Sequence, residues 1–107
     1  MLSRDEALEL IERMPYIRTL QAPNDTMLEE MFSQFLFESD PIKWVSVIKT
    51  CYIRQKALYQ GARPLTKRLD ELGTIVTSLL HVTLADALSI PTDKVDSFIA
   101  AHLANTM

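Results

Sequence analysis

Glycine and cysteine are scarce in this chain of 107 residues, and each scarcity excludes a class of protein. The two glycines, Gly61 and Gly73, are too few for a glycine-rich loop that cradles phosphate. The single cysteine, Cys51, excludes an intramolecular disulfide and predicts a reducing compartment, the cytoplasm. No apolar run approaches the roughly 18 residues that a membrane-spanning helix needs, so the sequence predicts no membrane partner.

Acidic residues are absent between Asp40 and Asp70. That window holds seven basic residues, namely Lys43, Lys49, Arg54, Lys56, Arg63, Lys67 and Arg68. Its net charge is therefore +7, whereas the rest of the chain, with four basic residues against fourteen carboxylates, carries −10. Phosphate binding depends on local clusters of Lys and Arg, so these seven residues are the predicted nucleic-acid-binding site. The alternative is a set of solvated helix edges, each basic head lying beside a carboxylate of another helix.

Apolar spacing close to 3.6 residues predicts an all-α fold, a compact bundle of about five helices that forms a single domain over residues 1–107. Polar residues and prolines punctuate the spacing and indicate where each helix begins. The expected N-caps and helix starts are Ser3 with Glu6 as a capping box, Asp40 as N-cap with Pro41, Thr66, and Pro91 with Thr92. For the second helix, Asn24, Asp25 and Thr26 are rival N-caps, and Thr26 with Glu29 forms the better capping box.

Within this pattern a few residues have specific expected environments. Trp44 belongs to the apolar side of the third helix and should be buried. Gly73 lies beside the apolar seam of the fourth helix, where a missing side chain would let a neighbouring helix come close. Pro15 ends the first helix, and Gly61 is a suitable residue to end the third.

The sequence offers no catalytic constellation, so we expect a protein that is not an enzyme and needs no cofactor or small-molecule substrate. His81 projects away from the apolar centre of its helix and should be a solvated surface residue. His102 falls on an apolar stripe, where a histidine is usually an edge residue with a satisfied partner. Cys51 belongs to the core face of the third helix and should behave as a small hydrophobe. These three residues have no spacing suited to a zinc site.

Five runs, in the same order along nearly the whole chain, resemble the helical C-terminal domain of the CarD family (the CarD/CdnL group) of bacterial transcription regulators. The runs are LSRDEALELIERMP at 2–15, PND at 23–25, DP at 40–41, VIKTCYIRQK at 47–56 and LADALSIP at 84–91. In that family an N-terminal Tudor-like domain binds the RNA polymerase β subunit, and the helical domain contacts promoter DNA and stabilises the open complex. The resemblance therefore implies a cytoplasmic, nucleoid-associated accessory domain with DNA and RNA polymerase as partners, the latter through an N-terminal domain that is not present in this chain.

One part of the family pattern is different here. Family members place a tryptophan wedge and arginines at the start of the second helix, whereas this chain has Asn24, Asp25 and Thr26 there, followed by Glu29 and Glu30. The wedge mechanism therefore does not carry over, and the expected DNA contact is weak and independent of base sequence. The alternative function is a helical protein-interaction module without DNA binding, which docks through apolar residues on polar faces, namely Met27, Ile42 or Ile53.

Overall fold

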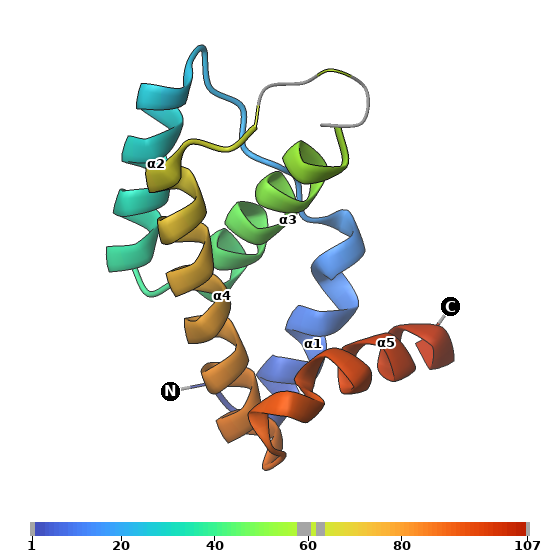
Figure 1. Cartoon of the computed structure of the whole chain (residues 1–107). Helices are drawn as coiled ribbons and strands as arrows, with labels where there is room; N and C mark the ends of the chain where they lie inside the picture. The colour runs from blue at the N-terminus through green and yellow to red at the C-terminus, as the bar shows by residue number, and fades with distance from the viewer. Residues whose placement is uncertain (1, 58–60, 62–63, 107) are drawn as a thin grey trace.

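Capping side chains and prolines set the ends of the helices in the computed structural model of the chain, which describes residues 2–57, 61 and 64–106. The elements are α1 (Arg4–Arg13), the short 3-10 helix η1 (Met14–Tyr16), α2 (Asp25–Phe37), α3 (Pro41–Ala57), α4 (Lys67–Leu88), the 3-10 helix η3 (Thr92–Lys94) and α5 (Val95–Thr106). The described residues contain no strand. The predicted all-α fold with five α-helices is confirmed for this part of the chain (Figure 1).

Most of the predicted helix starts are also confirmed. The Ser3 side chain accepts a hydrogen bond from the Glu6 amide, and the Glu6 carboxylate accepts one from the Ser3 amide, as a capping box requires. These hydrogen bonds to Ser3, the backbone one foremost, lower the pKa of Glu6. The Thr66 hydroxyl accepts from the Leu69 amide at 3.1 Å and caps α4.

The expected cap of α2 is wrong. Asn24 caps this helix, since its side-chain oxygen accepts from the amide of Met27 at 2.9 Å. Thr26 lies inside the first turn of the helix and does not form the expected box with Glu29. Asparagine ranks above threonine in intrinsic N-cap preference, and the backbone of Asn24 is extended (φ −153°, ψ 170°), as an N-cap requires.

Helix α4 is the centre of the fold and packs against α1, α2 and α3. Its buried side chains meet those of the other helices in one core, whose largest fully buried members are Phe32, Ile11, Leu69, Leu84, Leu88, Val47, Val76 and Val95. The predicted close approach at Gly73 is confirmed, because a Cβ atom there would lie 2.7 Å from Sγ of Cys51 on α3. Trp44 is 7% exposed, and its indole nitrogen donates to the Phe35 carbonyl at 3.0 Å. Its predicted burial is confirmed.

The connector between η1 and α2 crosses one face of α3. The Leu20 amide donates to the Thr50 hydroxyl at 2.8 Å, and this hydroxyl in turn donates to the Ser46 carbonyl at 2.7 Å. Thr50 is buried because the connector covers it. Tyr16, the last residue of η1, is exposed rather than packed on the core.

Helix α5 extends from the end of α4 past α1 (Figure 1). One histidine–carboxylate pair joins it to α4, and a second joins it to α1. His81 on α4 lies 2.9 Å from Asp96 on α5, and His102 on α5 lies 3.1 Å from Glu12 on α1. The expected edge position of His102 is confirmed. The expectation for His81 is wrong, because α5 covers it and leaves its side chain 29% exposed.

Candidate nucleic-acid interface

Six of the seven predicted nucleic-acid-binding residues are described by the structure, and they fall into two groups. Lys43, Lys49 and Arg54 make intramolecular polar contacts on the sides of α3, whereas Lys56, Lys67 and Arg68 extend into solvent. Arg63 lies outside the described residues. The two groups differ in what a phosphate group would have to displace.

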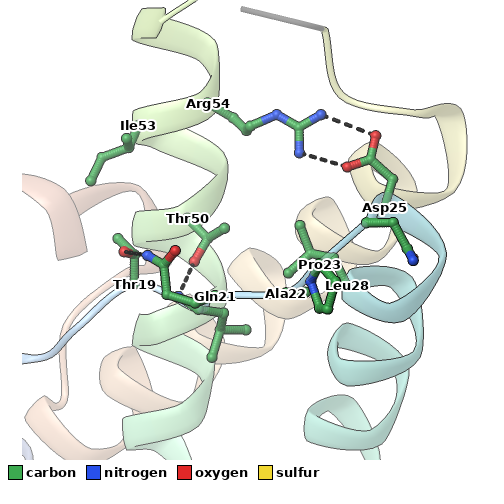
Figure 2. A pocket seen from close by; sticks show the side chains of 11 residues that line it. Thr19, Gln21, Ala22, Pro23, Asp25, Leu28, Thr50, Ile53 and Arg54 are labelled. Atoms are coloured by element: carbon green, nitrogen blue, oxygen red, sulfur yellow. Dashed lines mark hydrogen bonds and ion pairs between the residues drawn. The ribbon is translucent and has the colours of Figure 1, made fainter.

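Arg54 joins α3 to the first turn of α2. Its guanidinium forms two parallel hydrogen bonds to the Asp25 carboxylate, at 3.0 and 3.2 Å, and a third to the Pro64 carbonyl at 3.3 Å. Figure 2 shows this pair at one side of a hollow of about 390 Å³, which is lined by the connector, the start of α2 and α3. A bidentate Arg–carboxylate pair is specific and strong, so Arg54 acts first as a structural clamp.

Lys49 binds backbone carbonyls near the end of α1. Its ammonium group donates to the carbonyls of Met14 and Ile17, at 2.9 Å for Met14, and lies 3.5 Å from that of Pro15. The Met14 carbonyl also accepts from the Ile17 amide at 3.2 Å, so Lys49 reinforces the turn that closes η1. An ammonium group has three hydrogen-bond donors, and these contacts occupy the donors that a phosphate would need.

Lys43 pairs with Glu38 just after α2, and its ammonium also lies 5.1 Å from the centre of the Phe35 ring. The side-chain hydrogen bond from Lys43 lowers the pKa of Glu38. This carboxylate is therefore charged at neutral pH and forms an ion pair with the lysine. Both side chains are partly solvated, so the pair is exchangeable, unlike the clamp at Arg54.

Lys56, Lys67 and Arg68 are the accessible members of the basic window. Lys56 is exposed near the end of α3, with its ammonium 5.2 Å from the Tyr52 ring. Lys67 has a side chain 91% exposed and lies 4.0 Å from Glu71, a distance at which an exposed pair contributes little. Arg68 is exposed beside a hollow that it shares with Glu29 and Glu30 of α2.

The structure does not bring all the basic residues of the window to one side. Lys49 lines an apolar hollow between η1, α3, α4 and α5, whereas Arg68 lines a different one between α2 and α4. The end of α3 and the start of α4, which carry the exposed cations, do lie at the same end of the molecule (Figure 1). The charge segregation is therefore partly a feature of the linear sequence, because α2 supplies carboxylates to the neighbourhood of Arg54 and Arg68.

The other reactive side chains are those of metal-ligating type and the Cys51 thiol. Within residues 2–57, 61 and 64–106, no group of three or more His, Cys, Asp or Glu side chains could hold a metal ion. Burial, and secondarily the charge of Asp70, raises the pKa of the Cys51 thiol, so it is protonated at neutral pH. A protonated, half-buried thiol is a poor nucleophile.

Sequence reasoning placed the basic residues on the correct helices but missed their partners. The partners of Lys49 and Arg54 are distant in sequence and come from a connector and a helix start, which no periodicity reports. One signal was available: Asp25 is an acidic residue in the first turn of α2, where the helix dipole favours it, and such a residue is a ready partner for an arginine.

The comparisons with known proteins find no matching protein-family model, no matching curated protein and no matching solved structure. The resemblance to the CarD family therefore rests on the ordered sequence runs, and it leads to a proposal rather than to an assignment.

Proposed function

We propose that this chain is a non-enzymatic accessory domain of a CarD-like transcription regulator, which contacts promoter DNA next to RNA polymerase and stabilises the open complex. The support for the family is the order of five sequence runs over nearly the whole chain. An all-α domain with five helices agrees with that resemblance, although many unrelated proteins share such a fold.

The observation that carries the DNA contact is the exposure of Lys56, Lys67 and Arg68 at the end of the molecule where α3 ends and α4 begins. Their heads are available to phosphates without loss of a clamp or a helix cap. Three cations beside the carboxylates of α2 give a weak contact, with a dissociation constant of roughly 10⁻⁴ M or weaker at physiological salt. Attachment to RNA polymerase would raise the effective DNA concentration toward the millimolar range, where such an affinity suffices.

The test is a titration of short duplex DNA at several salt concentrations, followed by fluorescence anisotropy. The double variant Lys56→Ala/Lys67→Ala should bind duplex DNA more weakly, by about the same factor for every sequence. The slope of the logarithm of the binding constant against the logarithm of salt concentration should fall by roughly 0.9 for each phosphate that the variant no longer neutralises. The matched control is Arg13→Ala/Lys94→Ala, which removes two exposed cations elsewhere and should leave the slope unchanged. No binding of the wild-type chain even at low salt would overturn the proposal.

The second candidate function is a protein-interaction module without DNA binding. The observation that favours it is the exposure of Met27, Ile42 and Ile53, the three apolar residues that the sequence places on polar faces. They do not form one surface, since Ile42 and Ile53 line different hollows. A chain that binds no duplex DNA at low salt but retains its fold would favour this candidate over the first.

A further inference from the structure

Helix α4 carries an apolar stripe outside its core-facing side. Its members Ile75, Leu79 and Val82 are 47%, 37% and 58% exposed. At roughly 100° per residue they span about 60° of the helix circumference, on a side that points away from Leu80 and Leu84. In Figure 1, α4 lies on the viewer's side of the molecule, and no other described helix passes in front of it. A contiguous row of this kind, unlike a single exposed residue, calls for a partner surface.

Helix α4 is long, and part of its apolar surface lies outside the core. Among the described helices only α4 is long and apolar enough to cross a membrane, by length and composition alone, and 39% of its most apolar 18-residue window is buried within the molecule. Insertion into a bilayer would remove Leu69, Val76 and Leu84 from the core. A partner of the stripe would therefore have to leave the fold intact.

The charges at the two ends of the stripe are opposite and symmetrically spaced. Arg68 lies seven residues before Ile75, and Asp86 lies seven residues after Leu79. All four side chains fall within about 40° of one another around the helix at roughly 100° per residue, so both charges share the exposed face. Both charged residues are exposed.

We infer that α4 is a docking surface for a second copy of this chain, in an antiparallel contact with two-fold symmetry. In the register that places Ile75 of one copy beside Leu79 of the other, Arg68 of each copy lies opposite Asp86 of its partner. The apolar pairs and the charge pairs thus require the same register, and antiparallel helix dipoles add a favourable term. A two-fold contact repeats both pairs and closes on itself, as in most homodimers.

The association should be weak. The stripe presents three apolar side chains, and Glu29 and Glu30 share a hollow with Arg68, which reduces its attraction for the partner's carboxylate. We expect a dissociation constant on the order of 10⁻⁵ to 10⁻³ M, the range of small and transient interfaces.

The test uses the self-complementarity of the charges and is independent of DNA binding. Sedimentation equilibrium of the wild-type chain at low salt should give an average mass that rises toward that of a dimer with concentration. Arg68→Asp and Asp86→Arg should each reduce self-association several-fold, because each variant places like charges opposite one another at both ends. An equimolar mixture of the two variants should restore association, since every end of one variant then faces the opposite charge on the other.

Two controls keep the result specific. Arg18→Asp and Asp93→Arg change exposed charges away from α4 and should behave as the wild type, alone and mixed. Val82→Lys should abolish association while circular dichroism shows an unchanged helix content, because the side chain is exposed. A wild-type chain that stays monomeric at millimolar concentration, or a mixture that fails to restore association, would overturn the inference.

Discussion

At the scale of single residues, the contact between Gly73 and Cys51 shows how one missing side chain sets the distance between two helices. A Cβ at Gly73 would overlap Sγ of Cys51, at 2.7 Å. Glycine inside a helix costs about 1 kcal/mol relative to alanine. Gly73 therefore lowers the helix propensity of α4 but allows a close approach of α3 and α4.

Gly73→Ala should therefore destabilise the protein, by about 1–3 kcal/mol, because the half-buried Cys51 side chain must shift. In a Cys51→Ala background the clash is absent, and the same Gly73→Ala change should stabilise by up to about 1 kcal/mol through helix propensity. Urea unfolding of the four chains of this cycle measures both effects. An equal cost in both backgrounds would show that Cys51 is not the obstacle.

The Cys51 thiol gives a pH-dependent prediction. Burial, followed by the charge of Asp70, raises its pKa in the folded chain, so the folded state holds the proton more tightly than the unfolded state does. The contribution of this group to stability is undiminished below the pKa of the unfolded thiol and falls as pH rises through and above that value. Labelling with a thiol reagent at pH 8 should be slow for the folded chain and fast in urea, with Cys51→Ala as the blank.

At the scale of secondary-structure elements, α2 and α3 are held by the clamp between Asp25 and Arg54. Both side chains are about one-fifth exposed, at 19% and 20%, so their pair is screened less than a surface pair. The clamp also fixes the first turn of α2, the place where members of the CarD family have a tryptophan wedge. It keeps the guanidinium of Arg54 largely out of solvent.

Asp25→Asn should cost about 1–2 kcal/mol of unfolding free energy, because it removes the charge that a partly buried guanidinium faces. Glu71→Gln, which removes the exposed partner of Lys67, is the matched control and should change stability by less than about 0.5 kcal/mol. Thermal unfolding at neutral pH measures both variants. A loss in Asp25→Asn no larger than in the control would show that the clamp contributes little.

The element scale is also where sequence reasoning performs best and where its errors are most informative. Helix number, the capping box at Ser3, the cap at Thr66 and the burial of Trp44 follow from local rules, and the structure confirms them. The burial of Thr50 does not follow, because the connector that covers it is distant in sequence and has no periodic pattern.

At the scale of the whole molecule, a run of like charges in the sequence does not become a single surface. Alpha-helices rotate successive side chains by roughly 100°, so residues of one basic window face different neighbours. Arg54 meets Asp25 and Lys49 meets backbone carbonyls, and neither partner could be assigned without the tertiary arrangement. Exposure and the lack of close polar partners among the described residues distinguish Lys56, Lys67 and Arg68 from Lys43, Lys49 and Arg54, and both are properties of the fold.

The attachment of α5 to α1 has a consequence for how the chain acquires its structure during synthesis. The pair of Glu12 and His102 spans 90 residues, and the hydrogen bond from Arg4 to the Leu88 carbonyl spans 84. Among the five α-helices, α1 is the first to leave the ribosome, and it waits for nearly the whole chain before these partners emerge. The packing of α2, α3 and α4, and the contact of Lys49 with the end of α1, can form earlier, so we expect the docking of α5 on α1 to come late.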